Sequence, residues 1–469
     1  MAGIFILGEE KVRPGSYFNI RKNDDDSAAA VINGVTAVIF RSDFGPVGEA
    51  VELSRDDGYE SIFGTSGTTD AMGQALAGGA KTLIACRLGN GGAASSVALK
   101  DADGGNVLTI TAKYPGSKPF AVTVRESVTD NTIKECIIYS GTSEFKKMTF
   151  AAGEGEVQTL AATLASTGCF VAEMAEGAGS ATLANVVQAE FSGGEDPAVT
   201  IEDYSNALAA VEPYVFNTIC VDTEDVSVHA LVYSFLNRIF ENGSLAQAVI
   251  AEKSSIDLEV RQSRAAAYND EKMVYVLNDR VEAGGTVLEG YQTAARIAGM
   301  VGAVSSASSL THTVISGFTD LLERLTPTQI TKAEQKGCLV LSANSGGQIW
   351  IDSAINTLVT PAENQDKGWK KIRRVKTRFE LLRRCNDVTD NLVGKVDNDS
   401  NGRKTIISQL NNVCYEMQKE GKLNFYKVAE SELYKADGDS AWFTVDVVDK
   451  DSAEHIYTTF GFQFSTAEG

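Results

Sequence analysis

Two neighbouring stretches decide the fold class of this chain: FNTICV at residues 216–221 and VSVHALVYSFLNRIF at residues 226–240. The first is a short apolar run of the kind that forms a buried strand. In the second, apolar residues recur with helical spacing, at Val228, Leu231, Val232, Phe235 and Ile239. A buried strand that leads directly into an amphipathic helix is the unit from which α/β layers are built.

The same alternation continues on both sides of these stretches. Strands are expected at 36–40, 82–86, 248–251, 273–277 and 338–341, and helices at 70–76, 288–301 and 328–336. Alternating strands and helices favour a largely parallel sheet that is covered by helices. We therefore predict a multidomain α/β and α+β protein whose α/β core consists of residues 23–92 and 197–355.

Between the two parts of this core the sequence changes in character. Short β runs are separated by turn residues, at 107–112, 120–124 and 132–139. The segment begins after Gly89-Asn90-Gly91-Gly92 and ends in a linker at 192–197. This pattern predicts an inserted β-rich domain at 93–196.

The last hundred residues predict a separate α+β domain at 356–452. A long amphipathic helix is expected at 370–393, a second helix at 405–420 and a strand at 443–448. Gly421 is placed to end the second helix.

Extended arms are predicted at both ends of the chain, at 1–22 and 453–469. Short strands are expected in both arms, and their pairing residues are Tyr17, Phe18, Ile20, Ile456, Phe460, Phe462 and Phe464. A phenylalanine-rich strand at a chain end aggregates unless it is paired. The C-terminal strand either closes the sheet of its own domain or is donated to a neighbouring subunit by β-augmentation.

The charge of the chain is acidic overall but basic in one place. The net charge is −20, from 62 acidic and 42 basic residues, which argues against general binding to nucleic acid or to anionic membranes. The stretch 367–384 nevertheless holds nine Lys/Arg and one acid, Glu380. The candidate basic helix consists of Lys370, Lys371, Arg373, Arg374, Lys376, Arg378, Arg383 and Arg384. It is interpreted either as a solvated face or as a docking face for an acidic protein, since it lacks the interleaved aromatic residues that would stack on bases.

No motif of an enzyme or a cofactor site stands out. The chain has only three histidines, His229, His312 and His455, and no Gly-x-Ser-x-Gly. Residues 89–94 fit a dinucleotide-binding fingerprint, but β-type sequence follows instead of a helix. Residues 397–402 match the first half of a calcium loop, yet Ser408 occupies the position of the bidentate Glu. We expect a crossover into the insertion and a helix N-cap, respectively, with no cofactor and no metal.

The cysteines and the N-terminus favour a soluble protein made in a reducing compartment. The seven cysteines are spread along the chain without a CxxC, which predicts free thiols. Glu9 and Glu10 end the first apolar run, so no signal peptide is expected. The longest uncharged stretch, 297–319, is rich in Ser and Thr and too polar to span a bilayer.

Several short motifs, in order along nearly the whole chain, resemble those of contractile tail sheath proteins of phages and phage-tail-like particles. They are RPGSY at 13–17, GVTAV at 34–38, FGPVGE at 44–49, VEPYVFN at 211–217, LTPTQI at 325–330, INTL at 355–358, IRRV at 372–375 and VGKVDN at 393–398. Each motif is weak alone, and the ordered set carries the resemblance.

The resemblance implies an architecture. The α/β core would have a subtilisin-like layer without a working catalytic triad. The C-terminal domain would face an inner tail tube, and the basic helix is the candidate tube contact. Both arms would exchange strands between subunits.

The resemblance also implies a function. Subunits would form stacked hexameric rings around the tube and contract to drive the tube through a target envelope. The partners would be further copies of the chain, the tail tube protein, and baseplate and tail terminator proteins, without nucleic acid or direct membrane insertion. Assembly would occur in the bacterial host cytoplasm, and the product would be part of a virion tail or tail-like particle.

Two other classes remain open from sequence. An α/β hydrolase-like enzyme would need a Ser/His/Asp cluster in a cleft. Another self-assembling surface protein would be expected to carry an export signal.

Overall fold

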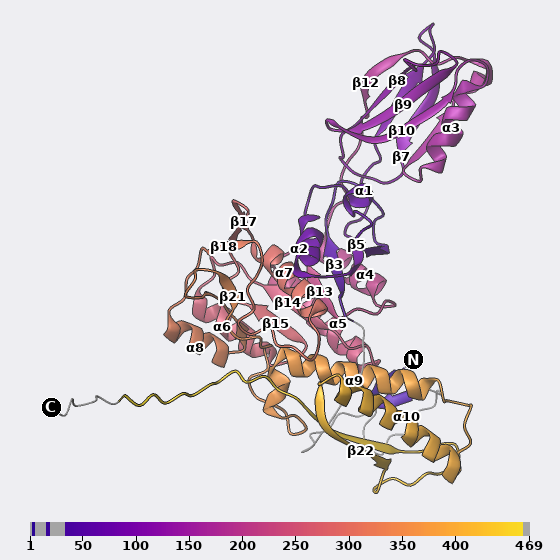
Figure 1. Cartoon of the computed structure of the whole chain (residues 1–469). Coiled ribbons are helices and arrows are strands. Elements are labelled where there is room, and N and C mark those ends of the chain that lie inside the picture. Colours follow the sequence, from indigo (N-terminus) through magenta and orange to yellow (C-terminus); the bar gives the residue numbers. More distant parts are fainter. Residues whose placement is uncertain (1, 5–15, 19–32, 463–469) are drawn as a thin grey trace, which may run out of the picture.

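The computed structural model describes residues 2–4, 16–18 and 33–462. In Figure 1 an α/β sheet with its helices occupies the middle of an elongated molecule. A β-rich unit lies at one end, and two long helices with a two-stranded sheet lie at the other. The C-terminal arm leaves the body as an extended chain.

The central sheet has seven strands in the order β19-β15-β14-β13-β3-β5-β4. Their bounds are Val35–Phe40 (β3), Ala50–Ser54 (β4), Thr82–Arg87 (β5), Thr218–Val221 (β13), Gln247–Ala251 (β14), Met273–Val276 (β15) and Cys338–Leu339 (β19). All neighbouring strands are parallel except β4, which pairs antiparallel with β5. The alternating pattern of the sequence predicted this largely parallel sheet.

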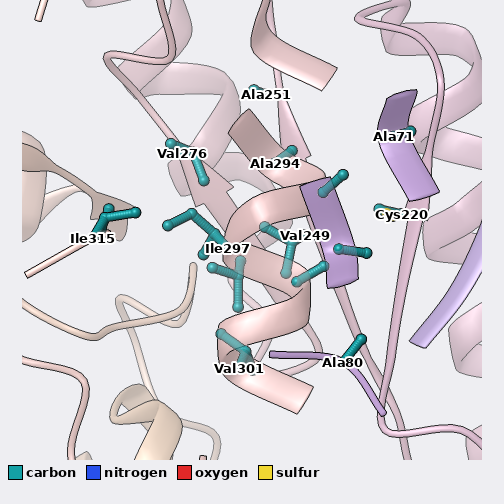
Figure 2. Close-up of a cluster of buried hydrophobic side chains, with 14 of the residues drawn as sticks. Ala71, Ala80, Cys220, Val249, Ala251, Val276, Ala294, Ile297, Val301 and Ile315 are labelled. Atoms are coloured by element: carbon teal, nitrogen blue, oxygen red, sulfur yellow. The ribbon is translucent and has the colours of Figure 1, made fainter. Parts of the chain in front are cut away.

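Helices cover both faces of this sheet. One face packs against α2 (Asp70–Gly78) and α7 (Gly290–Ala303). The other packs against α4 (Ile201–Val211), α5 (Val226–Glu241), α6 (Leu258–Tyr268) and α8 (Pro327–Gln335). Side chains of one strand alternate between the two cores, as in β3, because successive residues of a strand point to opposite faces. Figure 2 shows the first core, where Ile297 and Val301 of α7 lie beside Val249 and Val276 of the sheet.

The contact between α2 and α7 depends on glycine. A Cβ at Gly299 would lie 2.0 Å from the carbonyl oxygen of Ala75, and one at Gly78 would lie 2.2 Å from that of Arg296. Any side chain at these positions would push the two helices apart. The uncharged, small-residue stretch that begins at 297 is therefore a packing surface. Across the described residues, no helix is both long and apolar enough to cross a membrane.

The β-rich unit consists of two sheets and one helix. The sheets are formed by β8 (Phe120–Glu126), β9 (Ile133–Ser140), β10 (Ser143–Ala151) and β12 (Val186–Glu190), and by β6 (Ser96–Lys100), β7 (Asn106–Ala112) and β11 (Phe170–Met174). The helix is α3 (Glu156–Ser166). The glycine-rich crossover enters this unit as expected, because strand β6 and not a helix follows it. The segment that enters the unit and the segment that leaves it run side by side, with Asn90 paired to Ala198 and Ala93 to Glu195.

The joint between the β-rich unit and the central sheet is closely packed. Phe44, from the loop after β3, is buried in the aromatic core of the β-rich unit, 5.5 Å from the Tyr114 ring and 5.2 Å from the Phe120 ring. The fully buried Arg87 donates to the carbonyl oxygens of Ser42 (2.6 Å), Gly45 (2.7 Å) and Pro115 (2.8 Å). Burial lowers the pKa of this guanidinium to about 10. Side chains from both sides of the crossover thus hold the two parts together.

The C-terminal unit contains a short 3₁₀ turn, Lys367–Lys370, two helices and two strands. They are α9 (Ile372–Asp390), α10 (Ser400–Lys419), β22 (Leu423–Glu430) and β23 (Phe443–Asp449). Lys370 and Lys371 precede α9, because Lys371 is extended and stands at the N-cap. Asp399 caps α10 and accepts from the amides of Asn401 and Gly402, so this segment is the predicted cap.

Small elements complete the described part. They are β1 (Ala2–Ile4), β2 (Ser16–Phe18), α1 (Glu60–Phe63), 3₁₀ turn Ala178–Ser180, β16 (Val281–Ala283), β17 (Thr286–Leu288), β18 (Phe318–Leu321), β20 (Leu341–Ala343) and β21 (Ile349–Ile351). The predicted strand at 338–341 is therefore divided between β19 and β20. Helix α7 begins two residues later than expected, because Leu288 ends β17.

The terminal strands differ from expectation. The described part of the strand predicted at 456–464, residues 456–462, is extended but has no assigned strand in the single chain. A strand needs a neighbour for its backbone amides and carbonyls, and within the described residues this segment has none. At the other end, Tyr17 and Phe18 belong to β2, which pairs in parallel with β1. Ile20 and Phe464 lie outside the described residues.

One buried carboxyl group in the core lacks a partner. Asp279, just beyond β15, is fully buried, and neither carboxylate oxygen has a hydrogen-bond partner in another residue. Its side chain and that of Glu224 converge on Gly290, where a Cβ would lie 2.1 Å from Asp279 Oδ2 and 2.5 Å from Glu224 Oε1. Burial, with the nearby Glu224, raises the pKa of Asp279 to about 7. Folding thus favours the neutral form of this carboxyl group more than an exposed position would.

The first prediction concerns the joint. We expect Phe44→Ala to remove about 3–5 kcal/mol of stability from the β-rich unit, because a fully buried aromatic ring is deleted. Limited proteolysis should then cut at 89–92 and 193–197. Phe425→Ala, which truncates a half-exposed ring in β22, is the control and should leave these sites protected. Equal protection in the Phe44 variant would show that the joint does not depend on this ring.

The second prediction concerns Asp279. A carboxyl group whose pKa rises on folding stabilises the fold fully below its unfolded pKa, and that contribution is lost as pH rises through about 7. We therefore expect Asp279→Asn to exceed the natural chain in unfolding free energy at pH 8 by on the order of 2–4 kcal/mol, and by much less at pH 5. Urea unfolding at both pH values measures this, with exposed Asp56→Asn as control. A variant that is less stable at pH 8 would contradict the assignment.

Candidate functional site

The candidate site is the region where α9 meets the core, the two-stranded sheet and the base of the C-terminal arm (Figure 1). The basic residues singled out in the sequence all lie here. None of the eight side chains belongs to an exposed residue, and Lys376 is buried. A cation that is taken out of water needs acceptors close by, so the partners of these residues define the site.

Two of the cations bind the core. Lys376 Nζ donates to the carbonyl oxygens of Val301 and Gly302 (3.0 Å to Gly302), which end α7. Arg383 donates to the carbonyl oxygens of Phe216 (3.0 Å) and Leu245, which precede β13 and β14. Burial lowers the pKa of Lys376 to about 7 and that of Arg383 to about 10. These contacts fix α9 against the amino-terminal edge of the parallel strands.

Two more cations bind the end of β23. Arg374 donates to both oxygens of Asp449, each at 2.6 Å, in a bidentate pair. Arg378 donates to the same carboxylate at 3.1 and 3.2 Å, and to Asp366 at 2.8 Å. Burial alone would raise the pKa of Asp449, but the two guanidinium groups hold it below its usual value. The carboxylate therefore stays charged and ties β23 to α9.

The base of the arm is held by Lys371. Its Nζ lies 2.8 Å from Asp451 Oδ2 and 3.1 Å from Glu454 Oε2. The other oxygen of Glu454 accepts from the hydroxyls of Ser309 and Thr311, both at 3.2 Å, and of Ser452 at 2.8 Å. Burial alone would raise the pKa of Glu454, but these donors and Lys371 lower it.

The remaining contacts reach α10 and α8. Arg384 lies 2.9 Å from Glu380 and 3.2 Å from Glu420 at the end of α10. Lys422 joins the same two carboxylates at 2.7 and 2.6 Å. Lys370 donates to the carbonyl oxygen of Glu334 in α8 at 2.6 Å.

These contacts change the interpretation of the basic run. Its charges serve mainly to join α9 to the core, β23, α10 and the arm. The predicted tube contact through Lys370, Lys371, Arg373, Arg374, Lys376, Arg378, Arg383 and Arg384 stays a prediction, and the internal pairing argues against it. The acidic partners of these cations were not predicted from the sequence. The acids at 446–454 were the available signal, because their charge is opposite to that of the basic run.

Beyond Glu454 the arm is exposed. Ile456, Phe460 and Phe462 are 79%, 75% and 88% exposed. Their even spacing would place all three on one face of a strand. Three large apolar side chains on one face are costly to leave in water, so a further surface that covered this face would stabilise the arm.

The two-stranded sheet has no third strand among the described residues. In the described part of the chain, β22 and β23 pair only with each other. One face packs against α9 and α10 through Tyr426, Val428, Val445 and Val447. On β22, Phe425 is 52% exposed. Unpaired edges next to an exposed apolar side chain can accept a further strand.

The histidines are far from forming a catalytic arrangement. His229 is buried in α5, with Nε2 3.0 Å from the carbonyl oxygen of Thr223, and burial lowers its pKa to about 4. His312 stacks on Trp350 with ring centroids 4.0 Å apart, and His455 is on the arm. Over the ranges that the structure covers, no group of His, Cys, Asp and Glu is placed to hold a metal ion.

Comparison with known proteins identifies the fold. Residues 198–357 match the family model of the phage tail sheath protein central domain. The phage-like element PBSX protein XkdK of Bacillus subtilis (strain 168) is 25% identical over 386 residues, which cover 80% of this chain and 79% of that protein. The crystal structure of a sheath tail protein from Desulfitobacterium hafniense superposes with a TM-score of 0.70 at 22% identity, covering 92% of this chain and 100% of that one.

A more distant neighbour comes from an assembled particle. The anti-feeding prophage helical sheath in its contracted state has a TM-score of 0.52 at 12% identity, over 98% of both chains. The family match, the PBSX relative and the shared fold agree with the motifs that the sequence displays in order. Residues 198–357 thus match the central domain of phage tail sheath proteins, and the chain as a whole is similar in sequence and fold to proteins of phage-like elements and tail sheaths.

Proposed function

We propose that this chain is the subunit of a contractile sheath that polymerises as stacked hexameric rings around an inner tail tube. Contraction of the sheath drives the tube through the envelope of a target cell. The exposed, phenylalanine-rich arm carries this proposal, together with a two-stranded sheet that pairs with no third strand in the described part of the chain. Pairing with another chain would remove the exposed apolar side chains of this arm from water.

Strand exchange is the proposed link between subunits. Ile456, Phe460, Phe462 and Phe464 pair with a neighbour's C-terminal sheet, and the N-terminal strand with Tyr17, Phe18 and Ile20 pairs with another. Burial of each large apolar side chain contributes about 1.5–3 kcal/mol, and the added backbone hydrogen bonds fix the register. The links persist while side-chain interfaces change, so subunits stay connected during contraction.

Contraction requires no nucleotide. The extended sheath is metastable, and a trigger at the baseplate lets the subunits re-pack as rigid bodies into a form of lower free energy. The partners are therefore further copies of this chain, the tail tube protein, and the baseplate and tail terminator proteins. Assembly takes place in the host cytoplasm.

The proposed domains follow the sequence boundaries. The core at 23–92 and 197–355 has a subtilisin-like layer without a triad and acts as a scaffold, not as an enzyme. The insertion at 93–196 is carried by this core. The C-terminal domain at 356–452 lies on the tube side, with the arms 1–22 and 453–469 reaching its neighbours. A hydrolase or an exported surface protein has no comparable observation in its favour.

The third prediction tests the arm. We expect the full chain to form tubes in negative-stain electron microscopy, and a variant lacking 453–469 to stay monomeric with an unchanged circular dichroism spectrum. Phe460→Ser with Phe462→Ser should weaken assembly at least tenfold, because apolar burial is lost without shortening the arm. The matched control is Val128→Ser, an 89% exposed apolar residue of the β-rich unit.

Two results would speak against the proposal. A full chain that stays monomeric at high concentration, with its arm protected from protease, would mean that the strand closes its own sheet. Tubes formed equally well without 453–469 would remove the arm from the assembly mechanism and leave the sheath function in place.

A further inference from the structure

The base of the C-terminal arm is held to the body in a way that the rest of the arm is not. Five side chains form this contact, which we call the latch: Lys371, Asp451 and Glu454, with Ser309 and Thr311. The Glu454 side chain is 13% exposed, whereas every described residue from 455 onward is exposed. Burial at the base of the arm therefore ends at Glu454.

The latch joins parts that are distant in sequence. Lys371 is the N-cap residue of α9, and Ser309 and Thr311 belong to the loop after α7. Thr311 Oγ1 also accepts from the amide of Ala354, which fixes the hydroxyl that faces Glu454. Just upstream, Asp449 is bound by two arginines and is almost fully buried. The chain between Asp449 and Glu454 is thus tied at both ends.

We infer that this latch sets the point and direction at which the arm leaves the subunit, and that its opening lengthens the arm. This inference rests on the proposed strand exchange. Lys371 and Glu454 act as positioning residues, since neither is in the exposed pairing segment. With the latch closed, the free arm begins at His455. With the latch open, residues 451–454 join it and add on the order of 13 Å of reach, at ~3.3 Å per extended residue. Lys450 stays in place, because its amide donates to the carbonyl oxygen of Lys422.

The contact of Asp449 with the two arginines and the latch differ in how easily they open. Asp449 is buried and bidentate, so its removal leaves uncompensated buried charge. Lys371 and Asp451 are 26% and 33% exposed, and water can replace their contact at small cost. Tension on the arm would therefore open the latch first and leave β23 in place. A sheath whose subunits move apart could keep its strand exchange by this change in arm length.

The fourth prediction tests the position of the arm in the unassembled full chain. Spin labels introduced through an azide-bearing amino acid at His455 and Val314 report the distance between arm and body. We expect a narrow distribution in the natural chain, and one at least twice as wide in Lys371→Met and in Lys371→Met with Glu454→Gln. The matched control is Lys332→Met with Glu259→Gln, which opens an exposed ion pair elsewhere. Equal widths in all variants would overturn the latch.

The fifth prediction tests arm length in the assembly. Deleting Thr458 and Thr459 shortens the arm by two residues and preserves the alternation of its faces. We expect this deletion to reduce tube formation at least fivefold, and the latch-open double variant to restore it to within about twofold. The Lys332/Glu259 control should not restore it.

The outcomes separate the latch from the proposed function. No rescue by the open latch, or no defect in the shortened chain, would overturn the lengthening of the arm. Failure of the natural chain to form tubes would overturn the sheath proposal itself. The spin-label distances would still decide whether Lys371 and Glu454 hold the arm.

Discussion

The C-terminal half of this molecule depends on the cost of burying positive charge in α9. A buried cation whose partner is removed destabilises a protein by about 3–5 kcal/mol, so each paired basic residue of this helix restricts the element that supplies its acceptor. Lys376 and Arg383 require the carbonyl oxygens at the edge of the core, and Arg374 and Arg378 require Asp449. The orientation of the C-terminal unit and the start of the arm follow from these pairings.

The sequence was sufficient for elements whose signal is local. The strand at 218–221, the helix at 226–241 and the Asp399 cap each depend on residues within a few positions. Helix α6 was missed because Arg261 and Gln262 are buried in it, which disturbs the apolar spacing. The contacts of the basic run could not be predicted, because its partners are far away in sequence. Asp449 follows Arg374 by 75 residues, Glu454 is more distant still from Lys371, and a charge run alone does not show which acids it contacts.

The C-terminal arm shows a second limit of prediction from sequence. The period of two from Ile456 onward predicts a strand, yet residues 450–462 have no strand partner in the single chain. Under the proposed strand exchange, the partner of this segment is another subunit, which the single chain cannot show. The exposure of Phe460 and Phe462, and the lack of a third strand beside β22 and β23 among the described residues, are consistent with this exchange.

Different interactions attach the β-rich unit and the base of the C-terminal arm to the core. This difference affects how a sheath subunit could re-pack. The β-rich unit is held by the buried ring of Phe44 and by Arg87, whose carbonyl partners are shielded from water. Separating it would expose the aromatic cluster at once, so no partly open state is favoured. The arm base is held by partly exposed ions, which water can solvate one at a time. We therefore expect extended and contracted assemblies to superpose over the core and β-rich unit as one body, and to differ at residues 451–462.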